Sequence, residues 1–245
     1  MPNWKCNSKT PGLHIKSHAP IKSAQGYRPS PAERALAGLR EELAAYLLRC
    51  EQERQRRWGY KALRELCNLS SLLDSPAPRP VSAGLCIGGM ADAAVILAAA
   101  AGYGLRARLD SAPLQPVLLD AAALRTGLFN LIGNACRYAP DRRAELRVTY
   151  GPSRCRIRIE NKAAGYPRAG LGLMAASAAA GRLSGGFRLL FCEDRLTAAL
   201  DFPLPAAPPV ESLPSCGLAG YLGDPFSPAY VGLADLGYIP GCTGQ

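Results

Sequence analysis

The amino-acid sequence predicts an α+β fold: a two-layer α/β sandwich in which helices cover one face of a mixed, largely antiparallel sheet, preceded by a helical hairpin. Three observations support this prediction. Residues 30–74 repeat apolar side chains at helical spacing, residues 74–82 are rich in proline, and residues 82–205 alternate helical stretches with pairs of strand-like stretches. Pairs of strands separated by helices are typical of this layered architecture.

The same patterns divide the chain into four parts. Residues 1–29 are polar and without period, and are expected to form a disordered basic tail. Residues 30–74 are expected to form a helical hairpin of the dimerising kind, and residues 82–205 the sandwich domain. Residues 206–245 are rich in glycine and proline and are expected to be a tail, whose aromatic side chains either bind a partner or lie along the domain.

The hairpin prediction begins at a clear helix start. Ser30 can cap the helix, Pro31 suits its first position, and Glu33 can complete a capping box. Two apolar stripes then flank the charged sequence EQERQRR, with Leu36, Leu39, Leu43, Tyr46, Leu47 and Cys50 in the first and Leu63, Leu66, Leu69 and Leu73 in the second. One long helix and an antiparallel hairpin both fit. Because each stripe is narrow, we expect the segment to pair with a second copy of the chain or to dock on the next domain. A plain packed hairpin within a monomer is the alternative.

The elements of the sandwich domain follow from local signals. The expected order is a helix near 86–101, strands at 105–109 and 116–120, a helix over 121–139 capped by Asp120, strands at 144–150 and 154–161, a Gly-rich loop, a helix from about 172 to 183, and closing strands at 187–193 and 196–204.

Composition narrows the class of protein. The chain has 245 residues, of which 48% are hydrophobic, and this is ample for a domain with a sizeable core. No run of about eighteen uninterrupted apolar residues and no signal-peptide core is present, so we expect no membrane span and a cytoplasmic location. The nine cysteines form no C-x-x-C pair and occur beside only two histidines, so we expect reduced packing thiols and neither a zinc site nor disulfides.

The net charge of +10 is uneven along the chain. Residues 1–30 hold five lysines or arginines and no acid, whereas residues 206–245 hold three acids and no base. Since no nucleic-acid motif or aromatic-rich basic face accompanies the charge, a solvated tail is favoured and nucleic acid is not an expected partner.

A polar stripe lies along the predicted helix 121–139. Asn130, Asn134 and Arg137 follow each other at spacing i, i+4, i+7, beside an apolar face of leucines and alanines. Carboxamide oxygens can ligate Mg²⁺ together with water and phosphate oxygens, and a cation one turn on can neutralise a phosphate. The stripe therefore predicts a nucleotide–metal site, although two asparagines that face solvent or cap a loop would give the same pattern.

A glycine motif precedes the next predicted helix. Gly170 and Gly172, in the sequence AGLGLMAASAAAGRLSGGF, would let backbone N–H groups approach phosphates at a helix N-terminus, where the helix dipole favours anions. Tight packing at the start of a helix is the alternative.

The two motifs together resemble the asparagine box and the later glycine box of the ATP-binding domain of sensor histidine kinases, within the Bergerat-type (GHKL) superfamily. The resemblance covers roughly residues 82–205 and implies ATP and Mg²⁺ as cofactors. It implies the following contacts: magnesium and phosphates at Asn130 and Asn134, phosphate at Arg137, adenine at Tyr138 and Asn161, and the glycine boxes at Gly165, Gly170, Gly172 and Leu173.

The sequence departs from the family pattern around the adenine and the lid. Asn161 stands where the family has an adenine-binding aspartate, which costs about 1 kcal/mol of hydrogen-bond strength, and Ala163 replaces the first glycine of that box. Glu160 should point the other way on an alternating strand. The lid is nearly absent, because only YPRA separates Gly165 from Gly170, so poor nucleotide retention is expected.

The departures also bear on catalysis. Some relatives in the superfamily carry a water-activating glutamate where this chain has Asn130, so phosphoryl transfer is favoured over ATP hydrolysis. The hairpin holds no histidine; Arg40, in the sequence LREEL, stands near the place of the family's phosphoacceptor, and His14 and His18 lie in the basic tail. Autophosphorylation on histidine is therefore not supported, and no catalytic residue is assigned.

These observations favour a cytoplasmic, homodimeric, histidine-kinase-like protein that binds ATP and transfers its γ-phosphoryl group to a response-regulator-like or other signalling partner. The alternative is a catalytically degenerate pseudokinase, which acts as a dimerising scaffold. A serine-directed kinase that inhibits a transcription factor is a third possibility, although such proteins usually lack the preceding hairpin.

Overall fold

The structure, a computed structural model, describes the chain from residue 29 to residue 237 apart from residues 74–76, 168–169, 211 and 214–216. The predictions for the basic tail, with His14 and His18, and for the middle of the short lid fall outside the described residues.

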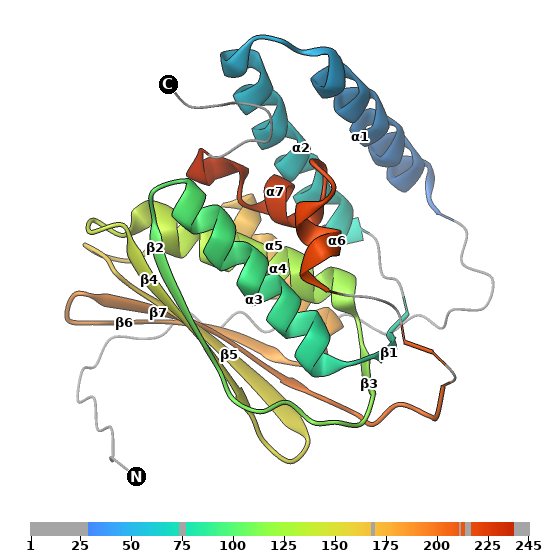
Figure 1. The fold of residues 1–245 in the computed structure, drawn as a ribbon, viewed down its shortest axis with the longest axis vertical. Helices are drawn as coiled ribbons and strands as arrows, with labels where there is room; N and C mark the ends of the chain where they lie inside the picture. The colour runs from blue at the N-terminus through green and yellow to red at the C-terminus, as the bar shows by residue number, and fades with distance from the viewer. Residues whose placement is uncertain (1–28, 74–76, 168–169, 211, 214–216, 238–245) are drawn as a thin grey trace.

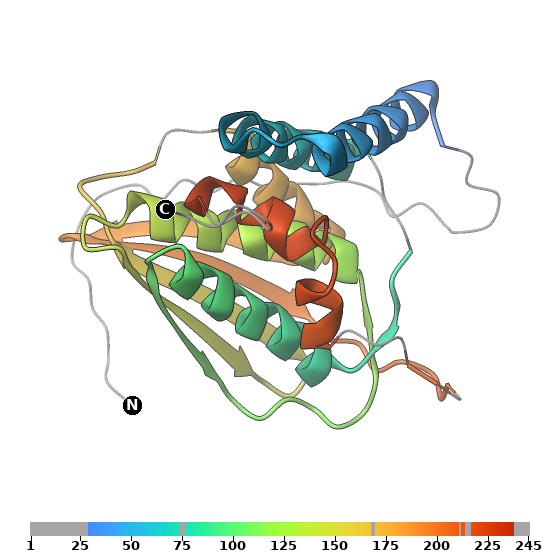
Figure 2. The ribbon, with the colours of Figure 1, turned by 45° about the horizontal axis from the view of Figure 1, so that its top comes forward.

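The described chain forms a two-layer α/β sandwich, as predicted (Figures 1 and 2). The main sheet has the strand order β2-β4-β5-β7-β6, in which β2 pairs with β4 in parallel and the other neighbours are antiparallel. Its strands are β2 (Gly104–Leu109), β4 (Arg143–Tyr150), β5 (Arg154–Lys162), β6 (Gly186–Cys192) and β7 (Arg195–Pro203). Helices α3 (Ala83–Ala100), α4 (Ala121–Tyr138) and α5 (Leu171–Arg182) cover one face of this sheet.

The core lies between the sheet and the three helices. Alternate residues of β5, such as Ile157 and Ile159, are buried beneath the helices, while the arginines between them face outward. Asp120 caps α4 as predicted, since its carboxylate accepts a hydrogen bond from the N–H of Ala123 at 2.9 Å. The same carboxylate, 5% exposed, accepts two hydrogen bonds from Arg182 at the end of α5, which ties the two helices together.

Helix α3 is apolar on nearly all sides. By length and composition it could cross a membrane, but 56% of it is buried inside the structure, as in the core helix of a globular domain. We treat it as a core helix for this reason.

A second, two-stranded sheet was not predicted. Strand β1 (Arg79–Val81) pairs antiparallel with β3 (Val117–Leu119), so part of the predicted proline linker belongs to the domain and the predicted strand at 116–120 stands outside the main sheet. The pairing joins residues far apart in the sequence, and three-residue strands are too short to show a period.

The N-terminal segment is an antiparallel hairpin rather than one long helix. Helices α1 (Pro31–Arg49) and α2 (Glu53–Leu73) are joined by a tight connection, and the capping box of Ser30 and Glu33 is present. Helix α2 packs against α5, α4 and the C-terminal segment, so the hairpin docks on the sandwich domain. Helix α1 extends away from the domain, and Leu47 is its one buried residue (Figure 2).

The C-terminal segment lies along the domain instead of leaving it as a tail. Helices α6 (Leu218–Leu222) and α7 (Pro228–Gly232) and the 3-10 helix η1 (Ala234–Leu236) pack between α2, α3 and α4. Aromatic side chains make the contact: Tyr221 meets Phe129 of α4 edge to face, and Phe226 stacks on Tyr60 of α2. Of the two roles considered for these aromatics, packing along the domain is the one observed.

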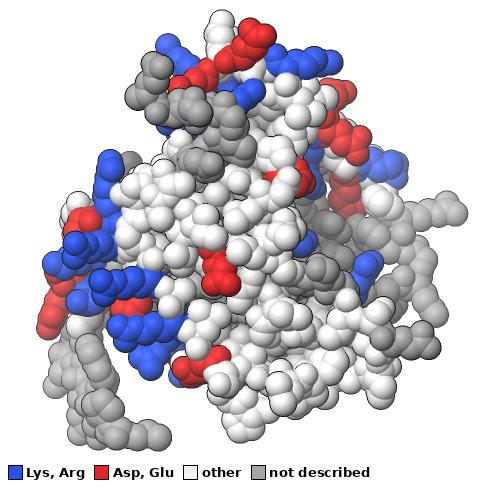
Figure 3. All heavy atoms as spheres, in the orientation of Figure 1, with Lys and Arg blue, Asp and Glu red and all other residues white. Residues whose placement is uncertain are grey.

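Charges gather at the edges of this face of the molecule. Figure 3 shows lysines and arginines over the strand ends and on the hairpin, while the surface over α3 and the C-terminal helices is largely uncharged. Many basic side chains on the outer face of the sheet are paired with acids, for example Arg154 and Arg156 with Asp201. This arrangement does not form one continuous basic stripe on the face shown.

The six described cysteines are free thiols, and four of them are buried, as expected for packing residues. Burial raises the pKa of Cys136 to about 12 and that of Cys155 to about 12, so both thiols stay protonated and unreactive at neutral pH.

The turn after α5 gives a test of this packing. A Cβ at Gly185 would lie 2.4 Å from the carbonyl oxygen of Asp201 and 2.7 Å from Cβ of Phe202, whereas a Cβ at Gly186 would meet nothing within 4 Å. We expect Gly185→Ala to lower the free energy of unfolding by about 1–3 kcal/mol in urea denaturation, because β6 must shift away from β7. The neighbouring Gly186→Ala is the control, with an expected loss of about 1 kcal/mol or less. Equal stability of the two variants would contradict this packing.

Candidate nucleotide site

Asn130, the first asparagine of the predicted stripe, lies at a junction of three helices. Its side chain is 4% exposed, and its Nδ2 donates to Oδ1 of Asn68 on α2 at 2.7 Å and to the carbonyl of Thr126 at 2.9 Å. Its Oδ1 is buried and has no hydrogen-bond partner among the described residues. The carboxamide is therefore held by its nitrogen, and its oxygen is an unused acceptor.

Gly172 makes room for that oxygen. A Cβ at Gly172 would lie 3.0 Å from Oδ1 of Asn130, so the first turn of α5 packs directly on the asparagine of α4. Gly170, the N-cap of α5, has extended φ and ψ, offers no side-chain cap, and has open space where a Cβ would be. The first N–H groups of a twelve-residue helix thus lie beside Asn130 without a side-chain partner, which is the arrangement that favours an anion.

The remaining glycine-box residues have different surroundings. Gly165 is half-buried with open space around its Cβ position, and Leu173 is buried in the core. None of Gly165, Gly170 and Gly172 has a positive φ, and of the three only Gly172 is required by a close approach, that of Asn130.

The second half of the stripe faces the C-terminal segment. Asn134 is half-buried and, within the described chain, has no side-chain hydrogen bond. Arg137 donates to Oδ2 of Asp235 in η1 at 2.6 Å, and its guanidinium carbon lies 4.5 Å from the ring centre of Tyr138. The predicted phosphate-binding cation is therefore engaged by an acid, and Tyr138 is half-exposed beside it.

Asp235 links this stripe to the hairpin. Its carboxylate accepts from Arg137 and also from Arg64 of α2, and both Asp235 and Arg64 are nearly buried, with side chains 10% and 8% exposed. The carboxylate thus joins α2, α4 and η1 over the C-terminal half of the predicted site. It pairs with Arg137, the arginine that the sequence pattern predicted to contact a phosphate.

Asn161 lies deeper, on β5. It is 5% exposed, on the face of the strand that carries Ile157 and Ile159, and its Nδ2 donates to the carbonyl of Lys162. Glu160 lies on the other face, where it pairs with Arg158, as the alternation predicted. Asn161 thus lies on the face of β5 that the helices cover, at the position where the family pattern has an aspartate.

The structure thus places Asn130 against the start of α5, with Asn134 and Arg137 one and two turns further along α4, but it also covers this stripe. Helix α2 reaches the stripe through Asn68, and η1 reaches it through Asp235. Neither covering residue could be predicted from the sequence, because their contacts with α4 span 62 and 98 residues and leave no local pattern.

The carboxamide oxygens of Asn130 and Asn134 are of a kind that can ligate magnesium. The described residues include no group of three or more His, Cys, Asp and Glu side chains that could hold a metal alone. The two carboxamides would need phosphate oxygens and water to complete the shell, which fits a magnesium–nucleotide complex. Because Oδ1 of Asn130 is enclosed, α2 or the first turn of α5 has to move before that oxygen can be a ligand.

Comparisons with known proteins agree with the fold. No protein-family model and no curated protein matches the sequence. Among solved structures, full-length ShkA in complex with AMPPNP matches with a TM-score of 0.54 and 19% identity over 71% of this chain. The Acinetobacter baumannii histidine kinase AdeS matches with a TM-score of 0.51 and 15% identity, over 72% of this chain and 99% of the AdeS chain.

The chain therefore has the fold of histidine kinase structures, which confirms the resemblance at the level of fold. It spans 46% of the ShkA chain, so the activity and partners of a whole kinase do not follow from the match.

The Asp235 bridge gives a second test. In Asp235→Ala the buried guanidinium of Arg64 would keep only Glu65, at 3.2 Å, as an acidic partner. We expect the free energy of unfolding to fall by about 3 kcal/mol and hydrogen exchange to rise in α2 and η1, because a buried charge loses its partner. Asp194→Ala, in the exposed turn between β6 and β7, is the control and should change stability by about 0.5 kcal/mol or less. If the two variants behave alike, Asp235 does not hold the segment on the domain.

Proposed function

We propose that this protein is a histidine-kinase-like signalling protein that binds ATP with Mg²⁺ on α4 and α5. The observation that carries the proposal is the pairing of Asn130 with Gly172, which places an unused carboxamide oxygen against the uncapped N-terminus of α5. The fold supports it, and so does the ShkA structure, which was obtained with the nucleotide AMPPNP.

The nucleotide would contact residues from three elements. Asn130 and Asn134 would share Mg²⁺ with phosphate oxygens, Arg137 would contact a phosphate, and the first N–H groups of α5 would receive the phosphate tail. Tyr138 and Asn161 would meet the adenine. When bound, Mg²⁺ would neutralise charge between the phosphates.

If the protein is active, it transfers the γ-phosphoryl group to a residue on a partner, and a response-regulator-like protein suits this role. The hairpin supplies no histidine, so the acceptor is sought outside it. Among the described residues, the carboxylate at the site, that of Asp235, is engaged by Arg64 and Arg137, so the chemistry we propose is positioning and charge stabilisation. A homodimer through α1 and a cytoplasmic location belong to the same proposal. Exposed Leu39 and Leu48 on α1 favour the dimer.

Nucleotide binding is tested by titrating the protein with a fluorescent ATP analogue, with and without Mg²⁺. We expect magnesium-dependent binding, weakened about tenfold or more in Asn134→Ala, because a ligand of the metal–phosphate complex is lost. Gln115→Ala, which removes an exposed carboxamide from the loop before β3, is the control and should bind as the wild type does.

The second candidate function is a non-catalytic dimerising scaffold. The engagement of Arg137 by Asp235 and the enclosure of Asn130 favour it, because both would have to be undone before a nucleotide binds. Absence of binding up to about 1 mM nucleotide, which corresponds to roughly 4 kcal/mol of binding free energy, would contradict the nucleotide site and leave the scaffold. A mass that stays monomeric at all concentrations in light scattering would contradict the dimer.

A further inference from the structure

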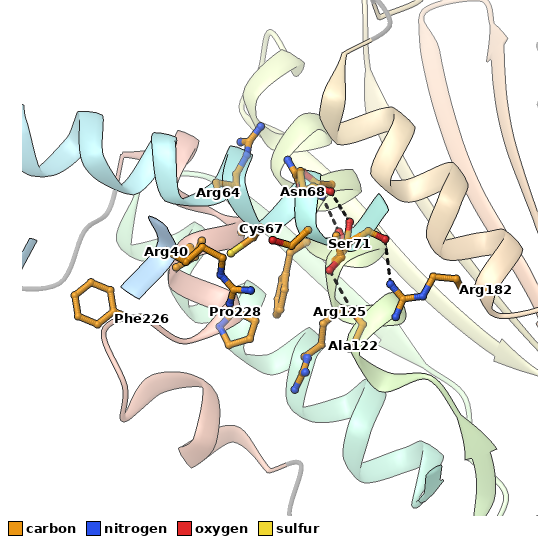
Figure 4. A pocket seen from close by; sticks show the side chains of 16 residues that line it. Arg40, Arg64, Cys67, Asn68, Ser71, Ala122, Arg125, Arg182, Phe226 and Pro228 are labelled. Atoms are coloured by element: carbon orange, nitrogen blue, oxygen red, sulfur yellow. Dashed lines mark hydrogen bonds between the residues drawn. The ribbon is translucent and has the colours of Figure 1, made fainter. Parts of the chain in front are cut away.

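A cavity separates the hairpin from the sandwich domain and borders the nucleotide site, with which it shares Asn130. Its volume is about 260 Å³, and its walls come from α1, α2, α4, α5 and the C-terminal segment. It extends from Asn130 toward the N-terminal half of α4, past Thr126 and Ala122, whereas Asn134 and Arg137 lie in the opposite direction along the helix. Figure 4 shows the side chains from these separate elements that line it, with Arg40 beside Pro228 and Arg182 beside Ser71.

The cavity is strongly basic. Arg40 of α1, Arg64 of α2, Arg125 of α4 and Arg182 of α5 all line it, and none of the residues that line it is acidic. Two of these arginines form ion pairs with acids that do not line the cavity, Arg64 with Asp235 and Arg182 with Asp120. Arg40 and Arg125 form no ion pair with any described residue.

Unused polar groups lie in the same walls. The Nε of Arg64 and the hydroxyl of Ser70 are buried and have no hydrogen-bond partner in the described chain. Buried donors in proteins are nearly always paired, so unpaired ones beside two free guanidinium groups point to a missing acceptor. Four donor groups from three helices suit an acceptor with several anionic oxygens.

One part of the wall is apolar. Phe129 of α4 and Phe226, Pro228 and Val231 of the C-terminal segment form it. A second hollow of about 270 Å³ lies toward α1, shares Arg40, Cys67, Phe226 and Val231 with the cavity, and is also lined by Glu41 and by apolar residues of α1 and α2. A ligand with an apolar body would therefore find room beyond the arginines.

From this arrangement we propose that the cavity binds a small organic monophosphate, with the phosphate on Arg40 and Arg125 and the apolar body against Phe226 and Phe129. A dianionic phosphate matches two unpaired guanidinium groups in charge and accepts the additional hydrogen bonds of Arg64 and Ser70. Because its walls come from the hairpin, the domain and the C-terminal segment, an occupied cavity would hold the three together.

The test uses phenyl phosphate as the probe, in isothermal titration calorimetry with the whole chain. We expect binding that weakens as the salt concentration rises, and that weakens about tenfold or more in Arg125→Ala and in Arg40→Ala. The control is Arg106→Ala, which removes an exposed, unpaired arginine from β2 and should bind as the wild type does. Thermal melting of each variant checks the fold; removal of an unpaired arginine should leave the melting temperature at or above that of the wild type.

Three further measurements separate the alternatives. Inorganic phosphate and phenol should each bind more weakly than phenyl phosphate. Equal affinity for inorganic phosphate would overturn the placing of the apolar body against Phe226 and Phe129. Equal affinity for phenol would overturn the placing of the phosphate on Arg40 and Arg125. Asn134→Ala should keep phenyl phosphate binding; its loss there would place the probe in the nucleotide site. No binding at about 10 mM phenyl phosphate, or equal binding by Arg125→Ala and Arg106→Ala, would overturn the proposal.

Discussion

The close approach of α4 and α5 is the constraint on which the rest of the structure depends. Small residues permit it: a Cβ at Gly127 would lie 3.1 Å from Cβ of Ala179, and one at Gly172 would lie 3.0 Å from Oδ1 of Asn130. The two helices run antiparallel, so Gly172 meets Asn130 at one end and Arg182 meets Asp120 at the other. A single packing arrangement thus fixes the uncapped start of α5 against the polar stripe and ties its far end to the cap of α4.

The hairpin and the C-terminal segment build on this pair of helices. Asn68 donates to the Glu65 carboxylate and accepts from Asn130 at the junction, while Asp235 accepts from Arg64 and Arg137 on two helices. Both contacts are polar and buried, so they specify where the added segments sit. Under the proposed function, docking of these segments and binding of a nucleotide would be competing states of one surface, because Asp235 engages Arg137 and Asn68 lies against Asn130.

The sequence allowed the fold class and the polar stripe to be predicted because both depend on local spacing. Asp120 before an apolar helix, the box of Ser30 and Glu33, and the alternation of β5 each show within a few residues. The pairing of β1 with β3 and the contacts of Asn68 and Asp235 could not be predicted, because each joins distant segments. Helices α6 and α7 are five residues long, too short for a period, so the segment that holds them was interpreted as a tail.

Hydrogen exchange measured with and without saturating magnesium–ATP tests the central claim most directly. If α4 and α5 carry a nucleotide site that the other segments cover, the amides of Leu171–Met174 will become more protected, and those of α2 and η1 less protected, when the nucleotide is added. An unchanged exchange pattern in all three segments would contradict the account, as would protection confined to the outer face of the sheet.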